Sequence, residues 1–136
     1  MRPFPDEVHA SHAHEVTAQD SAQRWGNDVP VLATPVLLWL GEITAMRAVE
    51  RYLEEDEMTV GVSHDSRHLA PTPVGRTVVL QAALRERRGG TLVFDVHGHD
   101  GVEEVLRGTH TRAVVDRGRF LARIAWKEQP AAACDA

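Results

Sequence analysis

The sequence predicts an α+β fold in which one long helix packs against an antiparallel sheet. Three observations predict it: one long helical pattern in residues 34–53, strand-like alternation in most of the chain after it, and tight-turn sequences between the strand candidates. Strands joined by tight turns run antiparallel, and an apolar sheet face needs a second layer to cover it. With 136 residues, the chain can form one domain with its own core.

The chain before the helix carries weaker signals. Residues 1–7 contain two prolines and three charges, so we expect a flexible N-terminal segment ahead of a domain that spans residues 8–127. Partial alternation in residues 8–16 indicates a first strand, and residues 21–25 favour one helical turn. Residues 26–30 have the composition of a loop. We expect residues 128–136 to form a flexible C-terminal tail.

The central helix is predicted to begin at Thr34 and to end near Leu53. Thr34 has the side chain of a good N-cap, and Pro35 suits the first helical position, where a missing N–H costs nothing. Apolar residues then recur at helical spacing: Leu38, Trp39, Ala45, Met46, Val49, Tyr52 and Leu53. The first half of the helix is apolar on nearly every side, so we expect other structure to wrap it.

Glu42 interrupts this apolar stripe. The residues three and four positions away from it are all apolar: Leu38, Trp39, Ala45 and Met46. A carboxylate among them would lose water and need a partner or a proton. Because sequences break their own pattern mainly where function demands it, Glu42 is a candidate functional residue. The alternative is a core carboxylate that forms a structural salt bridge.

The rest of the chain predicts strands at residues 58–69, 76–87, 91–99 and 102–116, with a short final strand at 120–126. Gly89-Gly90 and Asp100-Gly101 are strong hairpin-turn sequences, and residues 70–75 form a proline-rich break. A sheet wrapped around one central helix is the hotdog architecture. It leaves a sheet edge that needs cover. A two-fold dimer covers such an edge simply, so we expect a homodimer.

Composition excludes several classes of function. The net charge of −5 argues against nucleic-acid binding. No apolar run is long enough for a membrane span and no signal-peptide core is evident, so we expect a cytoplasmic protein without a membrane partner. Cys134 is the only cysteine and cannot form an internal disulfide. The pairs His12/His14 and His97/His99 lack further donors, so we expect no metal and no cofactor.

Two polar residues flank apolar segments in positions suited to chemistry. The Thr34 hydroxyl is either a helix cap or a nucleophile, or a holder of attacking water, beside helix N–H groups that favour an anion. Since Pro35 cannot donate, Val36 and Leu37 would supply N–H groups to an oxyanion. His68 ends a strand before the proline-rich break. Its neutral imidazole could take a hydroxyl proton and return it to a thiolate, although a surface histidine is the alternative.

Four segments carry a resemblance to a known family: Ala33-Thr34-Pro35 followed by Glu42, residues 68–75, residues 99–104, and residues 108–114. From about Val31 to Ile124 the chain resembles the fluoroacetyl-CoA thioesterase family of hotdog proteins. The resemblance implies thioester hydrolysis, with Thr34, Glu42 and His68 as the catalytic set. It also implies that Gly61 lies close to the acyl group, and Arg112 falls on a further family position. Residues 25–30 depart from the family's phenylalanine-rich lid.

We therefore expect a homodimeric thioesterase that hydrolyses a small or medium acyl-CoA or an acyl carrier-protein thioester. The alternatives are a non-catalytic acyl-thioester-binding protein and a hotdog hydratase, which would need an Asp/His pair. Eight helical residues separate Thr34 from Glu42 by about 12 Å of rise, so these two side chains cannot bond directly. His68, the substrate or a partner chain could bridge them.

Overall fold

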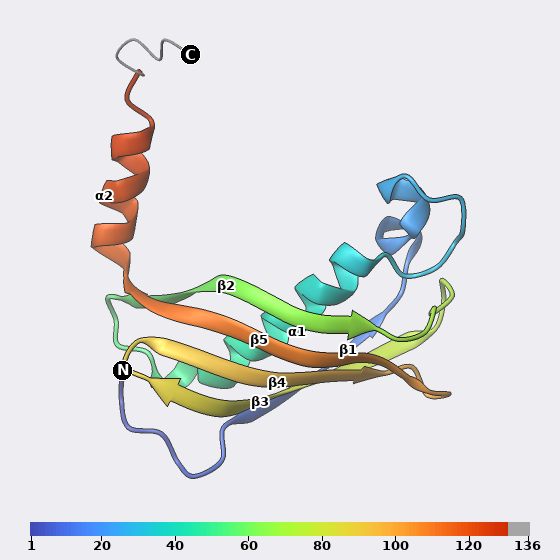
Figure 1. Cartoon of the computed structure of the whole chain (residues 1–136), viewed down its shortest axis with the longest axis horizontal. Helices are drawn as coiled ribbons and strands as arrows, with labels where there is room; N and C mark the ends of the chain where they lie inside the picture. The colour runs from blue at the N-terminus through green and yellow to red at the C-terminus, as the bar shows by residue number, and fades with distance from the viewer. Residues whose placement is uncertain (131–136) are drawn as a thin grey trace.

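Five antiparallel strands form one sheet in the computed structural model, which describes residues 1–130 (Figure 1). The strands are β1 (His9–Glu15), β2 (Glu57–His68), β3 (Thr77–Arg88), β4 (Thr91–His99) and β5 (Glu104–Asp116). Their order across the sheet is β1-β3-β4-β5-β2. Within the described residues, β1 and β2 are therefore the two edge strands. The predicted antiparallel α+β arrangement is confirmed.

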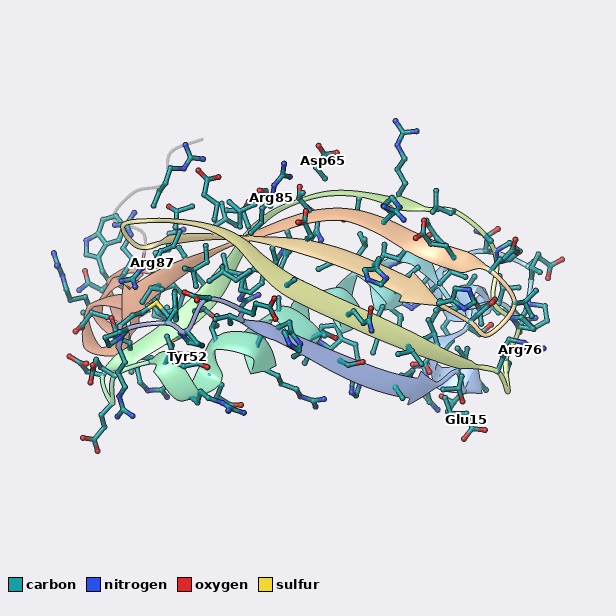
Figure 2. All side chains as sticks on the ribbon, turned by 90° about the horizontal axis from the view of Figure 1, so that it is seen from below. Glu15, Tyr52, Asp65, Arg76, Arg85 and Arg87 are labelled. Atoms are coloured by element: carbon teal, nitrogen blue, oxygen red, sulfur yellow. The ribbon has the colours of Figure 1, made fainter. Side chains whose placement is uncertain are left out.

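The long helix α1 (Thr34–Val49) crosses one face of this sheet and continues as a 3-10 turn, η3 (Glu50–Tyr52) (Figure 1). Its inner face buries Leu37, Leu40 and Val49 completely. These side chains meet the alternating buried positions of the strands, such as Leu80 and Phe94. The outer face of the sheet is mostly polar, and Figure 2 shows Asp65 and Arg85 on the side away from α1. The core thus lies between α1 and the inner sheet face.

Residues 17–33 form a compact cover over the N-terminal end of α1. Two 3-10 turns, η1 (Ala18–Asp20) and η2 (Ala22–Trp25), lie in this segment, where the sequence predicted one helical turn. The side chain of Asp20 caps the first turn through the Thr17 N–H, and the Ala33 N–H donates to the Asp20 carbonyl. The segment therefore fixes where α1 begins.

The helix begins at Thr34 as predicted, but its N-cap differs from the prediction by one position. Ala33, not Thr34, is the N-cap, and no side chain caps the helix there. Thr34 is the first helical residue, with Pro35 directly after it. The Thr34 hydroxyl is consequently free of the capping role expected for it, and it bonds elsewhere.

The predicted turns are confirmed. Gly89 and Gly101 adopt positive φ angles of 57° and 88°, a conformation that glycine reaches without steric cost. Asp100 accepts hydrogen bonds from the N–H groups of Val102 and Glu103. The Thr72 hydroxyl donates to the same carboxylate, so this turn also anchors the proline-rich loop that follows β2.

The prediction of a final strand at residues 120–126 is wrong. Residues Arg117–Lys127 form a second helix, α2, which stands away from the sheet (Figure 1). The Asp116 side chain accepts from the Arg119 N–H and caps this helix. Phe120, Ile124 and Trp126 fit an alternating pattern, but Phe120, Leu121 and Ile124 also fit helical spacing, and the aspartate cap selects the helix.

The N-terminal residues have no regular secondary structure, yet they are not detached. The N-terminal ammonium group pairs with Glu57 at 2.9 Å, the Arg2 N–H donates to the Tyr52 carbonyl, and Phe4 packs edge-on against Tyr52. The expected flexible segment at 1–7 is thus held by contacts. Cys134 and the end of the expected tail lie outside the described residues. None of the described helices is long and apolar enough to cross a membrane.

Candidate active site

The structure brings Thr34 and His68 together. The hydroxyl oxygen of Thr34 lies 2.7 Å from Nδ1 of His68. Thr34 is the first residue of α1 and His68 is the last residue of β2, so the helix start and the strand end together position this pair. A hydroxyl hydrogen-bonded to an imidazole is the arrangement that general-base activation requires.

An open pocket of about 460 Å³ adjoins the pair. Thr34 and His68 both line it, together with Trp25 and Asn27 from the segment before α1 and Pro71 from the loop after β2. Trp25 is strongly exposed at its rim. A small molecule can therefore reach the hydroxyl and the imidazole from solvent. Another cavity, of about 410 Å³, runs along β1, β3 and β4 and includes none of the predicted site residues.

Burial lowers the pKa of His68 below its ordinary value of 6.5, and the backbone of Ala70 partly opposes this shift. The second ring nitrogen, Nε2, is buried and has no hydrogen-bond partner among the described residues. An imidazole in this setting is neutral near pH 7, because burial disfavours its charged form. It can therefore accept a proton from the Thr34 hydroxyl.

The helix N–H groups expected to bind an oxyanion are only partly available. The Leu37 N–H donates to the Ala33 carbonyl at 3.0 Å, so this predicted donor is already engaged in the folded chain. The Val36 N–H has no backbone acceptor outside the helix among the described residues. Since the first N–H groups of a helix have no intrahelical acceptor, Val36 keeps the predicted capacity.

Glu42 is less buried than its apolar neighbours suggested. Its side chain is 31% exposed, because Trp39 and Met46 are themselves 53% and 43% exposed. The expectation that these neighbours remove water from the carboxylate is therefore wrong for a single chain. The outer face of α1 around Glu42 is an apolar surface with one carboxylate in it.

Arg112 supplies the charge that Glu42 needs. Nη1 of Arg112 lies 3.3 Å from Oε1 of Glu42. The guanidinium is itself anchored, because Nε donates to the Thr59 hydroxyl at 2.9 Å and Nη2 donates to the Thr59 carbonyl at 3.0 Å. Burial lowers the pKa of Arg112 and Glu42 opposes that shift. The pair spans α1 and β5, a connection that no local sequence pattern reveals.

Gly61 makes room for the carboxylate. A Cβ atom at this position would overlap Oε1 of Glu42 and would approach Nη1 of Arg112 to 3.5 Å. Any side chain at Gly61 would therefore displace Glu42 from its place above β2. Gly61 was predicted to lie at the site. The close approach of Glu42 to its backbone is a physical reason for a glycine at this position.

Two histidines outside the predicted catalytic set complete this cluster. His64 Nε2 lies 3.7 Å from Oε2 of Glu42, and His110 Nε2 lies 3.6 Å from Oε1. The rings of His64 and His110 are stacked, with centroids 4.1 Å apart. The alternating pattern of β5 placed His110 on the inner face, which is the one signal that could have found it.

The predicted site residues thus fall into two groups. Thr34 and His68 form one, at the N-terminal end of α1. Glu42, Gly61 and Arg112 form the other, two helical turns further along. Within the described chain, the ion pairs of Glu42 are with Arg112, His64 and His110 and not with His68. His68 therefore does not bridge Thr34 and Glu42 in a single chain.

Comparison with known proteins identifies the family. The sequence model of the fluoroacetyl-CoA-specific thioesterases matches residues 16–118. The chain belongs to this family. A curated relative, the fluoroacetyl-CoA thioesterase of Streptantibioticus cattleyicolor, is 40% identical over 97 residues, which cover 71% of this chain and 70% of the relative. The expected thioester hydrolase of the fluoroacetyl-CoA thioesterase type is confirmed at the level of the family.

Solved structures agree with this assignment. A structure of the fluoroacetyl-CoA thioesterase FlK superposes with a TM-score of 0.87 at 30% identity, covering 94% of this chain and 99% of that one. A thioesterase superfamily member from Thermus thermophilus has the same fold, with a TM-score of 0.87 at 22% identity over 93% of this chain and 95% of that one. The fold is therefore the predicted hotdog.

Proposed function

We propose that this protein hydrolyses a small or medium acyl-CoA thioester and that Thr34 and His68 form its reacting centre. The observation that carries the proposal is the 2.7 Å contact between Thr34 Oγ1 and His68 Nδ1 at the edge of an open pocket. A hydroxyl alone is a weak nucleophile, and a neutral imidazole beside it is the usual means of activation.

The reaction begins when His68 Nδ1 takes a proton from the Thr34 hydroxyl, or from a water held by it. The oxygen attacks the thioester carbonyl carbon, whose oxygen becomes the oxyanion of a tetrahedral intermediate. Collapse of the intermediate breaks the carbon–sulfur bond, and His68 returns its proton to the thiolate. If Thr34 attacks directly, a second cycle with water releases the acid from the threonine ester.

The oxyanion needs donors that are already in place. The Val36 N–H, in the first turn of α1, supports such a role, and the positive end of the helix dipole acts in the same direction. Leu37 contributes only its buried side chain to this end of the helix.

Glu42 acts through its charge. Its negative charge would favour an imidazolium or orient a bound substrate, but in one chain it faces Arg112 and not His68. We therefore place its action across a dimer interface. Trp39 and Met46 leave an apolar surface on both sides of Glu42, and the edge strand β2 lies beside it. A second copy covering this face would carry its Glu42 towards the reacting pair of the first.

The acyl group is small or medium. The FlK relatives act on fluoroacetyl-CoA by name, while Trp25 and Asn27 bound the pocket here. The segment at residues 25–30 therefore sets the shape of the space next to the reacting pair. An acyl carrier-protein thioester is the second candidate substrate, since a carrier presents the same thioester on the same pantetheine arm.

A panel of acyl-CoA thioesters tests the proposal. Acetyl, fluoroacetyl, butyryl, hexanoyl and decanoyl thioesters are incubated with the protein, and a thiol-trapping dye reports free coenzyme A. We expect turnover that is highest among the shorter chains and absent in a His68→Ala preparation. Tight binding of these thioesters without thiol release would instead identify an acyl-thioester-binding protein.

A further inference from the structure

We propose that Glu42, His64 and His110 form a binding site for a divalent transition metal of the zinc class. The three side chains each offer a donor atom, and these donor atoms all lie within 4.8 Å of one another. Within one chain, the site is separate from the Thr34–His68 pair. None of the three residues belongs to the histidine pairs that the sequence offered as metal candidates, because β2, β5 and α1 assemble the cluster only in the folded chain.

The spacing of the donor atoms suits a tetrahedral ion. His110 Nε2 and Glu42 Oε1 are 3.6 Å apart, and His64 Nε2 and Glu42 Oε2 are 3.7 Å apart. Ligands bound to zinc at about 2.0–2.1 Å in tetrahedral geometry lie about 3.3–3.4 Å from one another. The two distances run to different oxygens of Glu42, so one ion at ligand spacing from both histidines requires the carboxylate to turn as well as a contraction of a few tenths of an ångström.

His110 is held in the form that a metal requires. Its Nδ1 lies 3.0 Å from the Ser63 carbonyl, so Nδ1 carries the hydrogen and Nε2 presents its lone pair towards Glu42. A backbone carbonyl on the far nitrogen is the common outer contact of a metal-bound histidine, because it fixes the tautomer and the ring orientation. The ring is 1% exposed, so its orientation is fixed by packing.

His64 is the free member of the cluster. Both of its ring nitrogens are buried, and neither has a hydrogen-bond partner among the described residues. A buried polar atom without a partner is costly, and a metal ion would supply one. In the stacked arrangement the two ring planes are nearly parallel, with 18° between them, so one nearby ion cannot lie in both planes. His64 must turn to aim Nε2 at a shared ion, and this turn breaks no hydrogen bond.

Arg112 competes with the metal. Its Nη1 lies 3.3 Å from Oε1 of Glu42 and 3.1 Å from Nε2 of His110, so it occupies the side of both atoms that an ion would use. Binding therefore replaces a guanidinium nitrogen by a metal cation. Because the guanidinium is rigid, moving Nη1 aside also disturbs the two hydrogen bonds from Arg112 to Thr59. The exchange makes the site one of moderate affinity.

The donor set selects the class of ion. Two imidazole nitrogens and one carboxylate suit zinc, cobalt or nickel, whereas calcium and magnesium prefer all-oxygen surroundings. Three protein ligands leave a fourth position for water. In a single chain, the partly exposed Glu42 side chain opens this position to solvent.

Cobalt absorption and zinc dialysis test the site directly. Wild-type protein titrated with Co²⁺ should develop visible d–d bands that saturate at one ion per chain, and excess Zn²⁺ should abolish them. His64→Leu should lose these bands and should weaken zinc retention at least tenfold. The double variant His12→Leu/His97→Leu breaks both the His12/His14 and the His97/His99 pairs and should bind like the wild type.

A second measurement covers the case in which His64→Leu folds poorly. In wild-type protein, imidazole nitrogen NMR resonances of His64 and His110 should move together on addition of one equivalent of Zn²⁺, and by more than that of His68. Equal metal binding by wild type and a folded His64→Leu, or unmoved His64 and His110 resonances, would overturn the proposal.

A consequence for turnover rests on the proposed function. Because the ion would neutralise Glu42, Zn²⁺ should slow thioester hydrolysis by the wild type and by His12→Leu/His97→Leu more than by His64→Leu, each compared with its own metal-free rate. The two proposals fail separately. Metal binding without any thioesterase activity would refute the proposed function but not the metal site. Thioesterase activity without the cobalt bands would refute the metal site but not the reacting pair.

Discussion

The Thr34 hydroxyl and the His68 imidazole touch at 2.7 Å across 34 residues of chain. The contact is possible because Ala33 takes the N-cap position and leaves the Thr34 hydroxyl without a capping bond. The Thr34 hydroxyl therefore faces the end of β2 instead of the first helical turn. Its contact with His68 gives the threonine before Pro35 a role other than capping.

His68→Ala should lower kcat by about 10²–10⁴-fold, the usual contribution of a general acid–base group. The exposed His97 provides a matched control, and His97→Ala should retain the wild-type rate. Both are measured by thiol release from the best substrate of the panel. Near-normal turnover by His68→Ala would remove this imidazole from the mechanism.

The pH dependence of kcat/KM should reflect the lowered pKa of the buried His68 imidazole. Burial lowers the pKa of His68 below 6.5, so the neutral form needed to accept a proton persists to lower pH than in an ordinary histidine. The acid limb of kcat/KM should therefore have its midpoint below 6.5, with the rate falling as the pH falls through it. A midpoint at or above 6.5 would contradict the assignment.

Stability should also depend on pH, through His110. Burial lowers its pKa to about 4 from the ordinary 6.5. Between these values the unfolded chain binds a proton that the folded chain does not, so the free energy of unfolding should fall as the pH is lowered from 6.5 towards 4. Denaturant midpoints across this range should lose part of that slope in His110→Gln. An unchanged slope would show that His110 is not responsible.

Glu42→Gln should fold normally and lose most of its activity. The glutamine amide keeps the shape of the side chain, and its oxygen can still accept a hydrogen bond from Arg112, but the negative charge is lost. If Glu42 served only as a partly buried structural carboxylate, the neutral side chain would leave turnover nearly unchanged. Melting temperature and kcat/KM, measured on the same preparation, separate these outcomes.

Gly61→Ala should impair activity by moving the carboxylate. The added methyl group would overlap Glu42, so the side chain must turn away from Arg112. Gly41→Ala is the control, because its methyl group would make only an ordinary contact of 3.6 Å with Leu106. Wild-type kcat/KM in Gly61→Ala would mean that the position of Glu42 does not matter.

The protein should be a dimer, or a dimer of dimers, at micromolar concentration. Trp39→Lys places a charge in the exposed apolar surface of α1 and should shift the sedimentation profile towards monomer. Trp126→Lys, on the free-standing helix α2, changes an equally exposed tryptophan (53% and 55%) and should leave the dimer unchanged. A monomeric wild type would remove the partner chain from the site.

Local patterns predicted most of the fold. The bounds of β4 agree with the prediction residue for residue, because Gly89-Gly90 and Asp100-Gly101 mark both of its ends. The helix α2 was missed, since residues 120–126 fit two periods and only the Asp116 cap distinguishes them. The capping role given to Thr34 failed because its competing partner, His68, is distant in sequence.

The site was predicted only in part, for the same reason. Glu42 stood out because it breaks an apolar stripe, but its partner Arg112 lies 70 residues away. The neighbourhood of His64 depends on the pairing of β2 with β5, where it lies opposite His110. Single-sequence patterns carry no information on such cross-strand pairs, so this part of the site emerged only from the structure.

A double-mutant cycle on Thr34 and His68 tests the central claim most directly. Thr34→Val, His68→Ala and the double variant are compared with the wild type by kcat/KM for the best acyl-CoA. If the two side chains act as one unit, removing both should cost little more than removing the more damaging one. Losses that multiply in the double variant, or a rate close to wild type in either single variant, would contradict a shared reacting centre.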